Sequence, residues 1–151
     1  MNSTALRTAV AVAALFAANA ASAATIAALQ DGKTIAWIDS TTKKVTGTVD
    51  LAGGARLVGI GGRPSDGKLY GLTYDGAIVV VDHKTGKWEK KSQRSEKLPA
   101  GTKVSIDFNP VADRLRILTS TGQSLRVNVD DGKAVVDGAL KYAETDPGKG
   151  K

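Results

Sequence analysis

Residues 105–133 read SIDFNPVADRLRILTSTGQSLRVNVDDGK, and residues 59–87 read GIGGRPSDGKLYGLTYDGAIVVVDHKTGK. The two stretches align without a gap at a shift of 46 residues, which places Pro64 over Pro110. A third, partial copy covers residues 25–42 and lacks the opening strand of the unit. Self-similarity at such a period indicates a fold built by repeating one supersecondary unit.

Within each copy, apolar and polar residues alternate with a period of two, as Ile106 and Phe108 do around Asp107. Short alternating runs bounded by Asp-Gly and Thr-Gly pairs are typical of strands joined by tight turns. Each unit therefore predicts four strands in the order of a propeller blade, and the three copies predict three, four and four strands. The predicted core consists of Leu69, Val81, Ile106, Phe108, Ile117, Leu125 and Val127.

The predicted fold class is all-β, a propeller-like repeat of four-stranded antiparallel units. Because a closed propeller typically has at least four blades, the chain would form an incomplete or half propeller. A compact β sandwich or barrel is the alternative. The repeat domain is expected to span residues 24–142, followed by a flexible basic tail at residues 143–151.

The first residues have the pattern of a secretory signal peptide. One positive charge, Arg7, precedes an apolar run at residues 9–18, and Ala21-Ser22-Ala23 forms a small-x-small cleavage site. A membrane span needs about 20 apolar residues, so the run predicts a cleaved leader, residues 1–23, and no membrane span. We expect a periplasmic or secreted protein that is cleaved between Ala23 and Ala24.

Composition limits the possible chemistry. The sequence has no cysteine and one histidine, His83, so it offers neither thiolate chemistry nor a second histidine for a zinc site. No catalytic set, metal site or cofactor is predicted. The net charge is +6. Because the chain is expected outside the cytoplasm, this charge is expected to serve solubility or the binding of anionic envelope polymers, and no nucleic-acid partner is predicted.

Asp107, Arg116 and Arg126 alternate away from the apolar positions of the last repeat and are expected to share one sheet face. Two guanidinium groups oriented by a carboxylate can bind a carboxylate or phosphate, which predicts an anion-binding site. The alternative is a cross-strand ion-pair ladder that fixes register or closes a subunit interface.

A run of basic residues surrounds one tryptophan after the second repeat. As a basic-aromatic patch, it is a second candidate for binding an anionic cell-envelope polymer. The alternative is a solvated edge strand whose lysines prevent edge-to-edge aggregation. The residues of this basic segment are Lys87, Trp88, Lys90, Lys91 and Arg94.

Residues 106–142 resemble the signature of a bacterial family known as domain of unknown function 4394, with its DFNP, DR and TGQ elements and a closing DG-x-L-x-Y. Residues 57–72, LVGIGGRPSDGKLYGL, resemble an earlier motif of the same family, although Gly61 and Gly62 stand where a polar residue is usual. Family members generally continue for another set of repeats. The resemblance implies a propeller-like fold and no particular activity.

Three function classes follow. The sequence favours an exported, non-catalytic binding or scaffolding module. The first alternative is a hydrolase or lactonase-like enzyme of the propeller type, with acids such as Asp107 and Asp113 near a central channel. The second alternative is a self-assembling structural subunit, for example a homodimer in which two chains complete one propeller.

Overall fold

The computed structural model describes residues 24–96, 98–99, 101–138 and 143–149. The predicted leader, residues 1–23, lies outside the described residues, and so does residue 142 at the predicted end of the repeat domain. No helix within the described ranges is long and apolar enough to cross a membrane.

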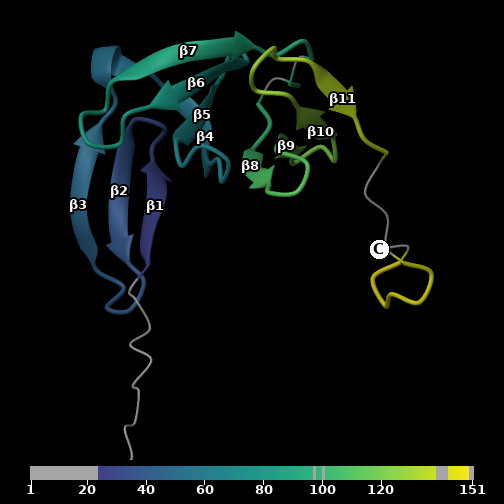
Figure 1. Ribbon diagram of the computed structural model, residues 1–151. Coiled ribbons are helices and arrows are strands. Elements are labelled where there is room, and N and C mark those ends of the chain that lie inside the picture. The colour runs from purple at the N-terminus through teal and green to yellow at the C-terminus, as the bar shows by residue number, and fades with distance from the viewer. Residues whose placement is uncertain (1–23, 97, 100, 139–142, 150–151) are drawn as a thin grey trace, which may run out of the picture.

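The described chain forms eleven strands in three antiparallel sheets that follow one another in chain order (Figure 1). We call the sheets blade 1 (β1–β3), blade 2 (β4–β7) and blade 3 (β8–β11); their three, four and four strands confirm the predicted partial propeller. The residues that the structure describes form neither a sandwich nor a closed barrel. The strands are β1 Thr25–Gln30, β2 Thr34–Asp39, β3 Val45–Asp50, β4 Leu57–Gly62, β5 Leu69–Thr73, β6 Ala77–Val81, β7 Trp88–Gln93, β8 Val104–Asn109, β9 Arg114–Thr119, β10 Ser124–Val127 and β11 Ala134–Val136, with a 3-10 turn, η1, at Ala52–Gly54.

Turn chemistry sets the strand order within each blade. Asp31, Gly32 and Lys33 connect β1 to β2, and the Lys33 amide donates to the carbonyl of Gln30 at 3.0 Å. Asp31 and Gly32, the two central residues of this turn, have positive φ, 51° and 70°, as a turn of this hand requires. Alternating apolar residues then select the buried face of each strand, because successive side chains of a strand point to opposite sides of the sheet. In β8 and β9, for example, Phe108 lies opposite Leu115 and both are buried.

Blade 2 is covered on both faces. One face packs Tyr70, Leu72 and Ile78 against Phe108 and Ile117 of blade 3. The Tyr70 and Phe108 rings meet edge to face with centroids 5.3 Å apart.

The other face of blade 2 packs Val79 and Val81 against Ile35 of blade 1. Each fully buried aliphatic side chain in these seams contributes about 1.5–3 kcal/mol. Six of the seven predicted core residues are buried and Leu69 is half-buried. Tyr74, which continues the alternation of β5, is instead 70% exposed because it lies beyond the end of that strand.

Candidate functional site

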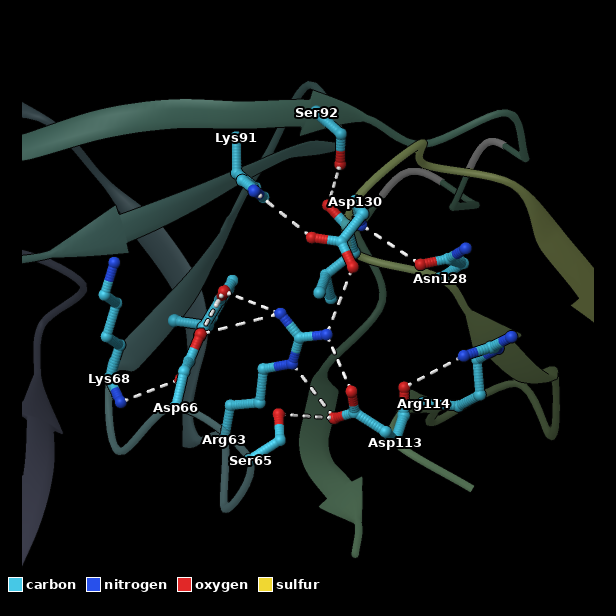
Figure 2. A network of polar contacts seen from close by, with 12 residues as sticks. Arg63, Ser65, Asp66, Lys68, Lys91, Ser92, Asp113, Arg114, Asn128 and Asp130 are labelled. Atoms are coloured by element: carbon cyan, nitrogen blue, oxygen red, sulfur yellow. Dashed lines mark hydrogen bonds and ion pairs between the residues drawn. The ribbon is translucent and has the colours of Figure 1, made fainter. Parts of the chain in front are cut away.

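A half-buried arginine, Arg63, connects blades 2 and 3 (Figure 2). Arg63 directly follows β4, and its guanidinium group makes two parallel hydrogen bonds to Asp113, Nε to Oδ1 at 2.9 Å and Nη2 to Oδ2 at 2.7 Å. Asp113 lies in the turn before β9, so the pair joins the two blades. Two parallel hydrogen bonds between a guanidinium group and a carboxylate fix their relative orientation as well as pairing their charges.

The remaining donors of Arg63 are also engaged. Nη2 lies 3.1 Å from Asp130 Oδ2, and Nη1 donates to the hydroxyl of Tyr70 at 3.1 Å. Tyr70 in turn donates to Asp66 Oδ2 at 2.8 Å, and Lys91 reaches the second oxygen of Asp130 at 3.1 Å. Figure 2 shows Arg63, Asp66 and Lys91 converging with Asp113 and Asp130 of blade 3. We call these groups, together with Tyr70, the Arg63 cluster.

The Arg63 cluster holds its carboxylates in the charged form. The hydrogen bond from Arg63 is the main reason why the pKa values of Asp113 and Asp130 are lowered. Burial acts to raise the pKa of Asp66, yet hydrogen bonds from the Lys68 amide and the Tyr70 hydroxyl outweigh it and lower that pKa as well. Carboxylates committed in this way suit a structural connection better than proton transfer.

Asp113 and Asp107, the acids of the enzymatic alternative, do not meet. Asp113 belongs to the Arg63 cluster, whereas Asp107 lies on the opposite, outer face of blade 3 and accepts a hydrogen bond from its neighbour's amide, that of Phe108, at 2.8 Å. In the part of the chain that the structure describes, no group of three or more His, Asp or Glu side chains is arranged to hold a metal ion.

The outer face of blade 3 carries the three residues of the predicted anion site. The strand register places Asp107 opposite Arg116, and Arg116 opposite Arg126. Arg114 lies on the same face, two residues before Arg116. We call Arg114, Arg116 and Arg126 together the arginine face.

Asp137, just after β11, orients two of these arginines. Its Oδ1 accepts a hydrogen bond from Arg126 Nε at 2.7 Å, and its Oδ2 lies 3.2 Å from Arg116 Nη1. Arg116 Nη1 also donates to the hydroxyl of Ser124 at 3.0 Å. The sequence assigned the orienting role to Asp107, but the structure places Asp137 there.

The repeat shows what is unusual about the arginine face. A shift of 46 residues relates Arg116 to Tyr70 and Arg126 to Val80. Tyr70 is buried against blade 3 and Val80 packs on the same core, whereas the side chains of Arg116 and Arg126 are 39% and 50% exposed. Guanidinium groups therefore stand where blade 2 has its apolar contact with the next blade.

A shallow pocket of about 250 Å³ continues the arginine face towards β11. It holds three cationic side chains against one carboxylate, so its net charge is positive. Lys133 and Asp131 form an exposed ion pair at 3.5 Å, which leaves Arg114 and Arg126 as its other charged groups. The lining residues are Arg114, Arg126, Asn128, Asp131, Lys133 and Val135.

The side chains of the basic segment make contacts in different directions. Trp88 Nε1 donates to the carbonyl of Ala52 near blade 1 at 3.0 Å, whereas Lys91 pairs with Asp130 of blade 3. Lys90 bonds to Gln93 at 2.7 Å.

Two members of the basic segment line an open pocket of about 410 Å³. Lys87 and Trp88 border it together with Lys68 and His83, but Asp82 and Glu89 offset their charge. The pocket therefore has little excess positive charge to select an anion.

Arg94 is not part of this exposed surface. The residue is 6% exposed because the chain leaves β7 here and crosses to blade 3, with the Arg94 amide bonded to the carbonyl of Gly76 and the Ser95 amide to that of Gly132. Burial lowers the pKa of Arg94, with a smaller opposing effect from Glu96. Alternation along β7 predicts an exposed arginine only as far as the strand continues, and β7 ends at Gln93.

Sequence reasoning missed Arg63 and Asp137. Both belong to motifs that carry the family resemblance, Arg63 to residues 57–72 and Asp137 to the closing DG-x-L-x-Y. Their place in these motifs was the signal by which the sequence could have singled them out. It did not indicate that Arg63 contacts Asp113, 50 residues away.

Comparisons with solved structures find distant similarity to much longer chains. A protein of unknown function from Bacteroides caccae matches with 15% identity and a TM-score of 0.44 over 74% of this chain and 38% of that chain. BamB from Moraxella catarrhalis matches with 13% identity and a TM-score of 0.46 over 80% and 34%. An auxiliary nutrient binding protein from Bacteroides thetaiotaomicron matches with 15% identity and a TM-score of 0.46 over 74% and 31%.

The chain thus spans about a third of the length of these structures. A comparison with curated proteins finds no match. The profile of one family, described as "Domain of unknown function (DUF4394)", matches residues 34–151. This match covers most of the chain and includes both full copies of the repeat, the Arg63 cluster and the arginine face, so the chain belongs to the DUF4394 family.

Proposed function

We propose that this chain is an exported, non-catalytic binding module that recognises an oxyanion-bearing partner through the arginine face. One observation carries the proposal: Arg116 and Arg126 replace the apolar Tyr70 and Val80 of the preceding repeat. A face meant to pack on another blade would keep apolar residues, as blade 2 does. Arginine is suited instead to carboxylates and phosphates, which it binds with two parallel hydrogen bonds.

The surroundings of the two arginines support binding. Asp137 restrains both guanidinium groups, which reduces the side-chain entropy lost when a ligand is bound. One carboxylate shared by two arginines leaves an excess positive charge. Arg114 extends that charge along the face, so a repeating anion such as an acidic envelope polysaccharide can make several contacts at once.

Removing the arginine charges tests the proposal. We expect the protein to bind polygalacturonate or polyphosphate, which present carboxylates and phosphates respectively, with an affinity that falls as salt rises. The double variant Arg116→Gln/Arg126→Gln should bind at least about tenfold more weakly, a loss of roughly 1.4 kcal/mol.

Lys87→Gln/Lys90→Gln in the basic segment is the matched control, because it removes the same charge from the other candidate surface. That control should bind as the unaltered protein does. If only the lysine variant loses affinity, the basic segment is the binding surface and the proposal fails. If neither polymer binds at low salt, recognition of such anions is excluded.

Self-assembly is a second candidate, because blade 1 leaves apolar side chains on its outer face. Ile26 is 49% exposed and Val45 is 59% exposed. Two chains arranged head to tail would place this face of one chain against the arginine face of the other, and a two-fold axis would close the ring. Light scattering that gives twice the chain mass, reduced to the monomer mass by Arg116→Ala, would support this assembly. A monomer at all concentrations would exclude it.

A further inference from the structure

Blade 1 has one strand fewer than the other blades. Blades 2 and 3 each begin with an inner strand, β4 or β8, that pairs with the next strand along the chain. Blade 1 begins with β1, which the repeat aligns with β5. Along its inner edge, β1 therefore has no neighbouring strand among the described residues.

Backbone groups line this inner edge. The amide of Ser40 donates to the carbonyl of Ala24 at 3.0 Å, and the register sets Thr25 opposite Asp39. In an antiparallel pair, the backbone amides and carbonyls of successive residues point alternately towards and away from the partner strand. Because Ala24 is bonded to Ser40, the even-numbered residues of β1 are the ones that bond to β2. The amides and carbonyls of Thr25, Ala27 and Leu29 therefore point towards the open edge.

Nothing in the composition of β1 protects this edge. Its sequence, TIAALQ, has no charged residue and no proline. The outer edges are protected by the usual means: β7 has Lys90, Lys91 and a register shift, β3 has a register shift, and β11 is three residues long. The inner edge of β1 is thus a template for one more strand.

The contact between β4 and β8 indicates which strand fits. Ile106 of β8 packs against Gly59 of β4 so closely that a Cβ at Gly59 would lie 3.1 Å from Ile106 Cγ1. Ile60 holds in β4 the place that Ile106 holds in β8, and it is only half-buried. A strand beside β1 would meet Ile60 in the same way, so it needs a small residue at that point.

We propose that the inner edge of β1, at Thr25, Ala27 and Leu29, accepts an antiparallel strand from a partner polypeptide that places Gly or Ala against Ile60. This strand-acceptor site is separate from the arginine face and recognises peptide backbone rather than anions. Main-chain hydrogen bonds would supply affinity, and the small residue would supply specificity.

A peptide with the sequence of residues 55–63, ARLVGIGGR, is the probe, because it contains the inner strand of blade 2 with its glycines. Added to protein recovered after export, it should bind saturably below about 1 mM. Hydrogen exchange should slow at the amides of Thr25, Ala27 and Leu29, whereas those of Ile26 and Ala28 should already be slow. The same peptide with Val at the position of Gly59 should bind at least about tenfold more weakly, because the added methyl groups meet Ile60.

Variants of β1 give a second readout. Ala27→Pro removes an outward amide without removing a bond to β2, and it should weaken peptide binding at least about tenfold. Thr25→Pro should do the same at the first residue of the strand, where proline is best tolerated. Ala28→Ser keeps every amide and is the matched control; circular dichroism establishes that each variant is folded.

Any of these binding results would overturn the proposal: no binding by the unaltered protein, equal binding of the Gly and Val peptides, or full binding by folded Ala27→Pro and Thr25→Pro. Amides at the edge that are already protected before peptide is added would mean that another segment occupies it, which also overturns the proposal. If the proline variants do not fold, the proposal is tested by comparing the affinities of the Gly and Val peptides for the unaltered protein.

Discussion

Gly86 and Gly132 lie 46 residues apart and make the same contact in consecutive blades. The carbonyl of Gly86 accepts the amide of Ala52 at 2.9 Å, and the carbonyl of Gly132 accepts the amide of Ser95 at 3.0 Å. In each case the last turn of one blade lies against the chain that leaves the preceding blade. Both glycines have positive φ, 70° and 75°. The repeat therefore preserves a junction between blades as well as the pattern of strands.

Gly132→Ala should destabilise the protein severely. A Cβ at Gly132 would overlap the carbonyl oxygen of Gln93, which is backbone and has little room to move. Gly122→Ala is the matched control, since its φ is also positive, 84°, but no atom lies within 4 Å of the added Cβ. We expect the control to lower the free energy of unfolding by about 1–2 kcal/mol, which is the cost of placing alanine in this backbone conformation. Thermal unfolding should show a much larger loss for Gly132→Ala, and equal losses would contradict the close contact.

Phe108→Ala should lower the free energy of unfolding by about 3–5 kcal/mol, since it opens a cavity in the seam between blades 2 and 3. Phe108 is 5% exposed and meets the ring of Tyr70. Val111→Ala, at a side chain that is 95% exposed, should change stability by less than about 0.5 kcal/mol. Urea unfolding measures both. A loss below about 1 kcal/mol for Phe108→Ala would place that side chain outside the core.

Arg63→Met should make stability less dependent on pH under acidic conditions. The pKa values of Asp113 and Asp130 are lowered in the folded protein, mainly by Arg63. The stability that these two carboxylates contribute is therefore complete above the ordinary carboxyl pKa of about 4. It is lost as the pH falls through their lowered pKa values in the folded protein. The stability difference between the unaltered protein and Arg63→Met should be largest above about pH 5 and should shrink below about pH 4.

Arg56→Met, at an exposed arginine, is the control for this measurement and should leave the pH profile unchanged. Urea unfolding across the acidic range would contradict the role of Arg63 if its substitution gave the same stability difference at every pH.

The alternation of side chains allowed the strands, their number in each blade and most of the core residues to be predicted, because strand period and turn residues are local properties. The Arg63 cluster was not predictable in this way. Its partners Asp113 and Asp130 lie in turns, where side-chain direction follows no period. Their distance from Arg63 in space depends on how two blades pack.

The candidate binding surfaces show the same limit. Register along β8, β9 and β10 follows from alternation, so the shared face of Asp107, Arg116 and Arg126 was predictable. The position of Asp137 depends on where β11 ends and on the turn of the chain beyond it. Arg94 was expected at the surface because it belongs to a run of basic residues, but β7 ends at Gln93 and the chain beyond it is buried at Arg94.

Export is tested by the N-terminus of the recovered protein. We predict that protein from the periplasm or the medium begins at Ala24, because Ala21 and Ala23 are the small residues that the signal peptidase requires. Mass spectrometry of the intact protein measures this directly. Membrane-bound protein that retains Met1 would contradict both the leader and the proposed compartment.

The arginine face is tested most directly by arginine-specific modification of the unaltered protein. Phenylglyoxal should react with Arg116 and Arg126, whose side chains are 39% and 50% exposed. Peptide mapping by mass spectrometry then gives the rate at each arginine with and without polygalacturonate. We predict that the polymer slows modification of Arg116 and Arg126 while the exposed Arg56 reacts at an unchanged rate. Equal rates at Arg116 and Arg126 with and without bound polymer would contradict recognition through this face.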